Sequence, residues 1–365
     1  MSEWQTFCLK DLVKIFGGST PPTNNPKNYG NKIRWITAKD LSTLQGRYIK
    51  KGSRSISRLG FKSCSTFLLP KHAILFSVRA PIGYTAIISK RSCTDRGLMG
   101  LIPNKKIYFE FLYYLLKYHK DNISNMGVGT TFKGISKPAL GLFKVEIPPT
   151  YYEQQKIART LSVLDQKIEN NHKINELLHT LAYKIYEYYF KYKPKNAKLE
   201  QIIIENPKSS IMVKNAQKTQ DKYPFFTSGD NTLSYPKAII DGRNCFLNTG
   251  GNAGIKFYVG KASYSTDTWC ICANEFSDYL YLLLSSIKNH INQSFFQGTS
   301  LKHLQKNLLK KYPIYMPSAH EIKKFNQIIM PLLTLISINT RTSKKLEQVR
   351  DFLLPLLLTQ QVKPQ

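Results

Sequence analysis

The stretch Val145-Glu146-Ile147-Pro148-Pro149, with Glu153-Gln154-Gln155-Lys156-Ile157 shortly after it, decides the architecture because it occurs twice. Its second copy reads Pro313-Ile314-Tyr315-Met316-Pro317, followed by Glu321-Ile322-Lys323-Lys324-Phe325. Between the two copies, the residue number of the acid rises from Glu153 to Glu321, an offset of 168. A repeated segment at this distance suggests that the whole chain was built by duplicating one unit.

Two further landmarks repeat in the same order. Phe111-Leu112-Tyr113-Tyr114-Leu115-Leu116, which reads as a short buried helix, returns as Tyr279-Leu280-Tyr281-Leu282-Leu283-Leu284, again at an offset of 168. Gly129-Thr130-Thr131-Phe132-Lys133 returns as Gly298-Thr299-Ser300-Leu301-Lys302, at an offset of 169. Four landmarks at a nearly constant offset predict a pseudo-two-fold internal repeat.

Each copy ends in a long helical pattern. The first contains apolar residues at steps of four, three and four, the spacing of a coiled-coil seam, at Ile157, Leu161, Leu164 and Ile168. After a phase shift the seam resumes at Ile174, Leu178, Leu181, Ile185 and Tyr188. The second offers Phe325, Ile329, Leu332, Ile336, Leu346, Val349 and Leu353. Helices of ~35 residues would each be ~50 Å long.

Individual residues indicate where the helices begin and how their seams align. Pro149 and Glu153 suit a helix N-terminus, where the helix dipole favours negative charge. Asn171 and Asn339 occupy equivalent seam positions, and a polar residue there fixes register. Pro331 has no counterpart in the first copy, so we expect a kink or a late start in the second helix. One such helix alone would be expected to dock on its own domain; two favour mutual packing.

The segments before the helices read as two globular domains. Both contain short β-prone runs between Gly-, Pro- and Asn-rich turns, which predicts α/β or α+β domains with mixed sheets. The runs are 33–37, 73–78 and 84–88 in the first domain and 245–249, 255–259 and 267–271 in the second. We predict domains at 1–150 and 193–318, with helices at 151–192 and 319–360. The linker Lys191-Tyr192-Lys193-Pro194-Lys195-Asn196 ends the first helix.

The charge balance predicts a polyanionic partner. The 365 residues include 53 Lys and Arg against 23 Asp and Glu, a formal net charge of +30. Such an excess repels itself within the fold and favours nucleic acid as the partner. The six cysteines are scattered and include no CxxC pair with a matching histidine spacing, which argues against a zinc site. Few cysteines in a chain of this size fit a reducing, cytoplasmic location. The N-terminus lacks the features of a signal peptide, and the most apolar run, 352–358, is too short to span a bilayer.

Four motifs carry a resemblance to a known family. They are Phe16-Gly17-Gly18-Ser19-Thr20-Pro21, Trp35-Ile36-Thr37-Ala38-Lys39-Asp40-Leu41, Gly129-Thr130-Thr131-Phe132, and the segment from Pro148 to Ile157 that continues through Leu161 and Leu164-Asp165. With them, the chain resembles over its whole length the specificity subunit of type I restriction–modification systems, or the similar recognition subunit of type IIB systems. The second copy departs from the pattern where Glu321 is followed by Ile322.

The resemblance implies two target recognition domains, each contacting one half of a split double-stranded DNA site. It also implies that two long antiparallel coiled-coil helices join them and set the spacing of the half-sites. Expected partners are methyltransferase (modification) subunits, two of them, and restriction or translocase subunits. No cofactor is expected on this chain: S-adenosylmethionine, and ATP with Mg²⁺, would bind the partner subunits.

Candidate DNA contacts are cations and small polar residues beside glycine- or turn-rich segments, since Lys and Arg neutralise phosphates and bidentate donors read bases. In the first domain they are Lys39, Arg79, Thr130 and Lys133, with the basic cluster Lys50, Lys51, Arg54 and Arg58. In the second domain they are Arg243, Asn248, Lys256, Thr299 and Lys302. For spacing and partner docking the candidates are the seam residues Ile157, Leu161, Leu164, Ile168, Asn171, Ile329, Leu332, Ile336, Asn339 and Leu346.

The sequence lacks the common motifs of DNA-modifying enzymes. Asn25-Pro26-Lys27 and Asn206-Pro207-Lys208 do not continue to the second proline of a methyltransferase motif. There is no phosphate-binding P-loop, and no Pro-Asp pair that could begin a metal-dependent nuclease motif. We therefore predict a non-catalytic subunit. The alternatives are a stand-alone nuclease or methyltransferase with an unrecognised site, and a structural RNA-binding protein.

Overall fold

The computed structural model describes residues 3–79, 81–129, 133–216 and 222–364. Two compact units divide the chain: unit 1 comprises Met1–Asn170 and Ser343–Gln365, and unit 2 comprises Asn171–Thr342. Each unit contains a mixed α/β domain and parts of two long helices, α7 (Tyr151–Tyr186) and α12 (Ala319–Leu358). A short π-helical turn, Glu187–Lys191, follows α7.

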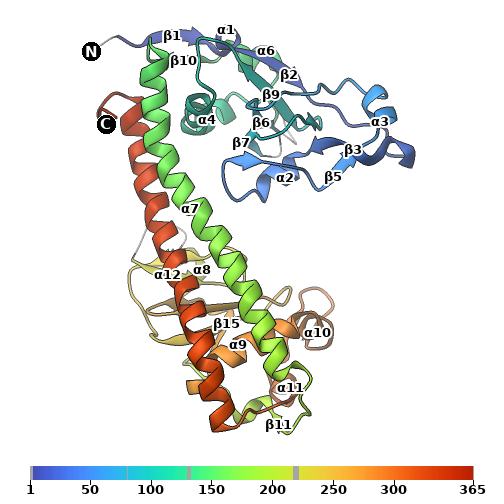
Figure 1. Ribbon diagram of the computed structural model, residues 1–365, viewed down its shortest axis with the longest axis vertical. Coiled ribbons are helices and arrows are strands. Elements are labelled where there is room, and N and C mark those ends of the chain that lie inside the picture. Colours follow the sequence, from blue (N-terminus) through green and yellow to red (C-terminus); the bar gives the residue numbers. More distant parts are fainter. Residues whose placement is uncertain (1–2, 80, 130–132, 217–221, 365) are drawn as a thin grey trace. The chain divides into compact units, whose positions relative to one another are not determined.

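Unit 1 is built on a five-stranded sheet in the order β2-β9-β6-β7-β4 (Figure 1). Its strands are β2 (Val13–Gly17), β9 (Leu98–Pro103), β6 (Ile74–Val78), β7 (Ile82–Ile88) and β4 (Tyr48–Ile49). A three-stranded sheet follows the order β5-β3-β8, with β5 (Arg54–Ile56), β3 (Tyr29–Ile36) and β8 (Cys93–Thr94). Both sheets contain one parallel pair, β4 with β7 and β3 with β8, so the predicted mixed sheets are confirmed.

The helices of unit 1 cover and connect these sheets. They are α1 (Leu9–Leu12), α2 (Ala38–Ser42), α3 (Arg58–Lys62), α4 (Phe109–Tyr118), α5 (Lys120–Asn125) and α6 (Lys137–Leu142), with a 3-10 turn at Pro26–Asn28. The predicted buried helix is α4, whose residues 111–116 are all buried against the core. A separate strand pair, β1 (Gln5–Cys8) with β10 (Lys144–Ile147), joins the start of the domain to its end.

Unit 2 repeats the plan with shorter strands. Its four-stranded sheet has the order β12-β18-β15-β16, with β12 (Ile204–Glu205), β18 (Thr268–Cys272), β15 (Arg243–Asn248) and β16 (Ile255–Val259). Its three-stranded sheet, β14-β13-β17, again includes a parallel pair, with β14 (Leu233–Tyr235), β13 (Tyr223–Phe226) and β17 (Ser263–Tyr264). The pairs β11 (Ala197–Lys198) with β21 (Pro313–Ile314) and β19 (Phe296–Gln297) with β20 (His303–Leu304) complete it.

Helices α8 (Val213–Ala216), α9 (Ser277–Ser286), α10 (Lys288–Ser294) and α11 (Lys306–Lys310), with 3-10 turns at Leu199–Gln201 and Asn274–Phe276, belong to unit 2. The repeat seen in the sequence is visible here: α9 corresponds to α4, and the pair β11–β21 corresponds to β1–β10. The β-prone runs predicted in both domains fall in strands to within one residue, since periodicity in apolar residues is a local property of the chain.

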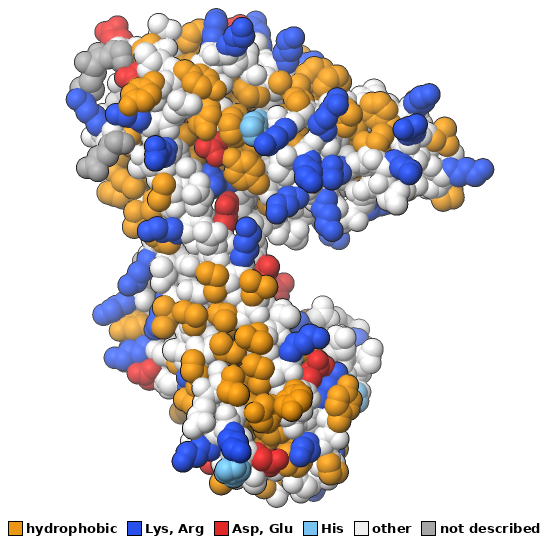
Figure 2. Space-filling view, in the orientation of Figure 1, with side chains coloured by type: hydrophobic (Ala, Val, Ile, Leu, Met, Phe, Trp, Pro, Cys, Tyr) orange, Lys and Arg blue, Asp and Glu red, His pale blue; other side chains and the backbone are white. Residues whose placement is uncertain are grey.

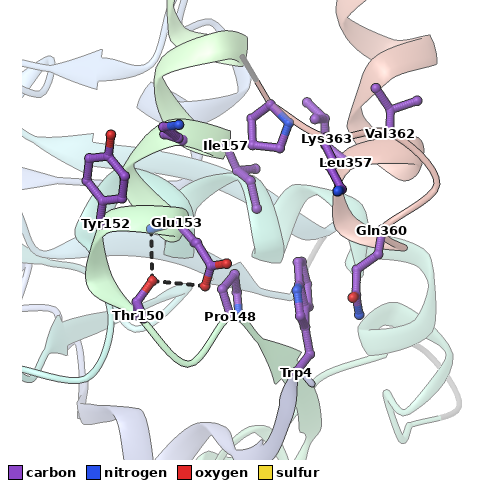
Figure 3. Close-up of a pocket in the computed structure, with 12 residues that line it drawn as sticks. Trp4, Pro148, Thr150, Tyr152, Glu153, Ile157, Leu357, Gln360, Val362 and Lys363 are labelled. Carbon is purple, nitrogen blue, oxygen red and sulfur yellow. Dashed lines mark hydrogen bonds between the residues drawn. The ribbon is translucent and has the colours of Figure 1, made fainter. Parts of the chain in front are cut away.

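Both long helices begin with the same cap. Thr150 Oγ1 accepts a hydrogen bond from the Glu153 amide and donates one to the Glu153 carboxylate (Figure 3). Ser318 and Glu321 repeat the arrangement at α12. A Ser or Thr cap with Glu three residues later satisfies amides that the helix itself leaves unbonded. The predicted late start near Pro331 is wrong, because buried Ile329 and Leu333 on either side of this exposed proline hold the helix in place.

Within each unit, α7 and α12 pack antiparallel. In unit 1, Ile157 and Leu161 of α7 share a core with Leu354, Leu357 and Leu358 at the other end of α12. In unit 2, Phe190, just past α7, stacks edge-to-face on Phe325 of α12, with ring centroids 4.9 Å apart. Farther back along α7, Asn339 Nδ2 donates to Asn175 Oδ1 over 3.0 Å. The predicted mutual packing of the two helices is confirmed.

Among the described residues, no helix is both long and apolar enough to cross a membrane. The long helices carry too many charged side chains for that role, although their buried faces are apolar.

Candidate nucleic-acid interface

Asp40 organises the basic part of unit 1. Its carboxylate accepts hydrogen bonds from the amides of Thr37 (2.8 Å) and Ser53 (2.8 Å), so it caps α2 and holds the segment before β5. Gly52 passes so close that a Cβ there would lie 2.3 Å from the Trp35 carbonyl oxygen. The capped helix carries Lys39, and the held segment carries Lys50 and Lys51, all exposed. One half-buried carboxylate therefore brings separate lysines to the same region.

The pKa of Asp40 lies below its ordinary value of 3.8: burial acts to raise it, but the hydrogen bonds from the Thr37 and Ser53 amides outweigh burial. Its contribution to stability is therefore full above pH 3.8 and is lost as the pH falls through the lower pKa of the folded chain. We expect Asp40→Ala to lower the free energy of unfolding by about 1–2 kcal/mol at pH 7. Urea unfolding at pH 7 and at pH 3 measures this effect. A difference between variant and native chain that does not shrink at pH 3 would contradict the assignment.

The Phe16-Gly17-Gly18-Ser19 motif has a structural role. The Gly18 amide donates to the Leu98 carbonyl, and the Ser19 amide donates to the Thr94 carbonyl, each over 3.0 Å. A Cβ on Gly18 would lie 1.9 Å from the Asp95 carbonyl oxygen, so only glycine fits. The motif closes the turn after β2 against the β8–β9 connection.

Lys and Arg side chains gather over the part of unit 1 that carries α2, α3, β3 and β5 (Figure 2). The predicted Lys39, Lys50, Lys51, Arg54 and Arg58 are all exposed there. The guanidinium of Arg54 lies over the ring of Tyr29, 4.1 Å from its centroid, which fixes the direction of this cation. Sequence reasoning missed Lys32 and Arg34, exposed on β3. Their alternation with Ile33 and Trp35 was the signal that could have found them.

Arg79 and Lys133 lie close together in the fold although they are far apart in sequence. A β-bridge joins Arg79 to Gly134, the neighbour of Lys133, and a second bridge joins Val128 to Gly134. Arg79 and Lys133 are both exposed. Thr130, the remaining candidate of this domain, lies outside the described residues.

The bridge beside the Gly-Thr motif recurs in unit 2. Strands β19 and β20 pair Gln297 with His303, which matches the Val128–Gly134 bridge at an offset of 169. Gly129 and Gly298 have nearly equal φ values of 138° and 142°, a conformation that side chains other than glycine's rarely adopt. Thr299 and Lys302 are exposed. The residues that flank the motif are therefore bridged in the same way in both units.

The other three candidates of unit 2 have their polar groups bonded inside the domain. Lys256 Nζ donates to the carbonyls of Thr227 (2.7 Å) and Gly229, and burial lowers its pKa. Asn248 is buried and donates to the Asn252 carbonyl. The Arg243 guanidinium is paired with Asp278. Contacting DNA would require breaking these bonds, so we correct the prediction and remove Lys256, Asn248 and Arg243 from the candidate interface.

The seam residues also need a correction. Ile157, Leu161, Ile168, Ile329 and Ile336 are all at most 7% exposed and form intramolecular core. Leu164, Leu332 and Leu346 are half-buried. A partner subunit could not reach the fully buried set without unpacking the chain. The second run of predicted seam residues is partly wrong, because Ile174, Leu181 and Tyr188 are exposed. Leu177, between Ile174 and Leu181 on α7, is exposed as well.

One cavity of unit 1 has a lining with a structural role. A cavity of about 480 Å³ lies between Trp4, the start of α7 and the C-terminal tail (Figure 3). Its walls include Ile157, Leu357 and Val362, and its Glu153 carboxylate serves the cap of α7. Within the described parts of the chain, no group of three or more His, Cys, Asp or Glu side chains could hold a metal ion.

Comparison with known proteins fits this geometry. The family model described as the type I restriction modification DNA specificity domain matches residues 1–180 and 195–348, one match for each copy of the repeat. The chain belongs to this family. This member carries two specificity domains in tandem, as the internal duplication predicted.

Two relatives are similar to this specificity chain over most of its length. The type I restriction enzyme MjaIX specificity subunit of Methanocaldococcus jannaschii is 29% identical, over 98% of this chain and 93% of that protein. A putative type I specificity subunit of Mycoplasma genitalium is 24% identical, over 84% of this chain and 80% of its own length. The crystal structure of a type I S subunit from M. genitalium has the same fold, with a TM-score of 0.65, 18% identity and coverage of 98% and 96%.

As a family member the chain is a DNA-specificity subunit, which recognises sequence and leaves catalysis to other subunits of a restriction–modification complex. The matching family model and the curated relative both belong to type I systems, not to the type IIB alternative. The hypothesis of a stand-alone enzyme is no longer needed.

Proposed function

We propose that the chain reads a bipartite duplex site, with the domain of unit 1 on one half-site and the domain of unit 2 on the other. The duplicated Gly-Thr motif supports this proposal best, because both units bridge the residues that flank it in the same way. A recognition element that is present in two copies supports a DNA site made of two parts. The two segments differ in sequence beyond the shared motif, so the two half-sites are expected to differ.

The proposed DNA contacts fall into two kinds. The exposed cations of unit 1 bind phosphates: Lys39, Lys50, Lys51, Arg54, Arg58, Arg79 and Lys133. Lys302 in unit 2, the counterpart of Lys133, also binds phosphate. The two threonines of the repeated motif, Thr299 and Thr130, are the proposed contacts to base edges. Phosphate contacts provide salt-dependent affinity, whereas base contacts provide specificity.

Selection from a random duplex pool tests the proposal. The purified chain should enrich sequences with two constant blocks separated by a spacer of constant length. Structured RNA added as competitor should leave the enriched duplex bound. Enrichment of a single uninterrupted block would contradict a bipartite site, and loss of the duplex to RNA would favour the RNA-binding alternative.

We further propose that a methyltransferase subunit docks on the exposed aliphatic face of α7 in unit 2. Ile174, Leu177 and Leu181 are 42%, 71% and 48% exposed, and their spacing of three and four places them on one face of the helix. Leu335 and Ile338 of α12 are also exposed in this unit. Hydrophobic side chains gather over this part of α7 (Figure 2). S-adenosylmethionine would bind that partner, and ATP with Mg²⁺ a restriction subunit.

Leu177→Asp tests the docking face. We expect the variant to lose its methyltransferase subunit in co-purification, with affinity reduced on the order of 100-fold, because a carboxylate would be buried in an apolar contact. Duplex binding by the chain alone should be unchanged, since Leu177 is exposed in the free chain. Leu142→Asp, at a leucine 56% exposed on α6, is the matched control. Equal loss in both variants would place the docking face elsewhere.

A further inference from the structure

Each recognition domain is attached to a long helix through an arginine that reaches an acid on the neighbouring short helix. In unit 1, Arg47 lies just before β4 and is 3% exposed; its Nη1 is 3.3 Å from Glu110 Oε1 on α4. In unit 2, the Arg243 guanidinium on β15 is paired with Asp278 on α9. Glu110 and Asp278 are separated by the repeat offset of 168, so the two acids occupy the same position in the repeat.

The attachment to the long helix is repeated as well. In unit 1, Glu169 of α7 accepts hydrogen bonds from the Arg47 amide (2.8 Å) and from Arg47 Nε (3.2 Å). In unit 2, Ser337 of α12 accepts one from the Val259 amide over 3.0 Å. Glu169 and Ser337 are again separated by the repeat offset. Val259 pairs with Arg243 in the sheet. In unit 1, Arg47 alone therefore contacts both the acid on the short helix and Glu169 on the long helix. In unit 2, Arg243 contacts the acid and its strand partner Val259 contacts Ser337.

Arg243 also bonds directly to the long helix. Its Nη1 donates to Thr334 Oγ1 (2.9 Å), and its Nη2 donates to the Met330 carbonyl (3.2 Å). Thr334, Ser337 and the Met330 carbonyl thus form one face of α12 against the edge of the sheet. We call each set of contacts a seat: Arg47, Glu110 and Glu169 in unit 1; Arg243, Val259, Asp278, Thr334 and Ser337 in unit 2.

A glycine with positive φ stands beside the attachment in both seats. Gly46, with φ of 109°, precedes Arg47, and a Cβ on it would lie 3.1 Å from the Glu169 side chain. Gly260, with φ of 123°, follows Val259, and a Cβ on it would lie 3.0 Å from Arg341. Both glycines let the backbone of an edge strand approach the long helix closely. Both units therefore attach the edge strand of the sheet to a long helix, although most of the residues that make the attachment differ.

We propose that the two seats set the orientation of each recognition domain on its long helix, and thereby the spacing between half-sites that the chain accepts. Arg47 and Arg243 are positioning residues: they hold the reading surface and read no base themselves. This inference rests on the proposed bipartite recognition. The seat fixes the edge strand of the main sheet, β4 in unit 1 and β16 in unit 2, so loosening it frees the domain to turn without altering the residues that face DNA.

The test uses the full chain and loosens the seat of unit 2 from the helix side. Thr334→Val with Ser337→Ala removes two acceptors while the Arg243–Asp278 pair stays intact, so no unpaired charge is buried. The native chain first selects its two half-sites from random duplexes. Binding is then measured on duplexes that carry those half-sites with a series of shorter and longer spacers.

We expect the double variant to keep the base preferences of both half-sites. Its discrimination against the wrong spacers should fall about tenfold, the effect of losing a hydrogen bond to a charged group. Ser337→Thr, which retains the hydroxyl, should keep the native spacer preference. Thr180→Val, which removes a hydroxyl bonded to its own helix at the Glu176 carbonyl, is the matched control and should also behave as native.

Three results would overturn the inference. An unchanged spacer preference would show that the seat does not position the domain. Equal weakening on all spacers would show a role in stability alone, and a changed base preference would show that the seat shapes the reading surface. If the native chain selects no bipartite site at all, the proposed function fails first, and that outcome is visible before any variant is made.

Discussion

Replacing Lys50, Lys51 and Arg54 together with glutamine is expected to weaken duplex binding on the order of 100-fold at about 0.15 M salt. Each cation that neutralises a phosphate releases condensed counterions, so each lost contact should reduce the slope of log affinity against log salt by about 0.9. These three residues are exposed in one short segment that Asp40 holds in place. They contribute little to the core, so the fold should persist.

Measuring the affinity for duplex DNA from low to moderate salt separates direct phosphate contacts from a general attraction of the net positive charge to DNA. Lys311→Gln, Lys323→Gln and Lys324→Gln make a matched control, since these exposed lysines of unit 2 carry the same charge outside the candidate interface. The control triple should retain most of the affinity and the native slope. A control that loses as much as the test variant would mean that net charge, and not this surface, attracts DNA.

Arg350→Met is expected to destabilise unit 1 by about 3–5 kcal/mol, the largest stability effect we predict. Arg350 Nη1 donates to Asp165 Oδ1 over 2.7 Å, and Tyr114 donates to Asp165 Oδ2 over 2.6 Å. Asp165 is 4% exposed. Burial acts to lower the pKa of Arg350, but attraction to Asp165 prevails and keeps it raised. Removing the arginine would leave a buried carboxylate without its nearest cation, since Arg47 Nε lies 4.0 Å away.

Unit 2 supplies the control for this prediction. The positions of Asp165, Tyr114 and Arg350 correspond, at the offset of 168, to Leu333, Leu282 and Ala182, all buried in the core of unit 2. The triple variant Asp165→Leu, Tyr114→Leu, Arg350→Ala copies that apolar solution into unit 1. We expect it to recover most of the stability lost in Arg350→Met, as measured by urea unfolding. A triple variant as unstable as Arg350→Met would show that the loss comes from packing rather than from removing the closest cation of Asp165.

Several DNA-contact residues were predicted from residue type alone, and some of these predictions had to be corrected. Lys39 and Arg54 are exposed, as a contact with DNA requires. Arg243 and Lys256 looked equally suitable but are engaged inside unit 2. A charged side chain can bind DNA or pair with another group inside the fold, and its neighbours in the folded chain determine which.

The sequence by itself determined the duplication, the presence of the two long helices and the class of each domain. These features are written in local periodicity and in repeated motifs, which need no knowledge of distant neighbours. The tertiary structure alone decided which charges are free for DNA and which side chains form the seats, since Arg47 meets Glu169, and Arg243 meets Asp278, from distant parts of the sequence. Pairing between charges depends on a few ångströms of separation, and such distances are set only when the whole chain has folded.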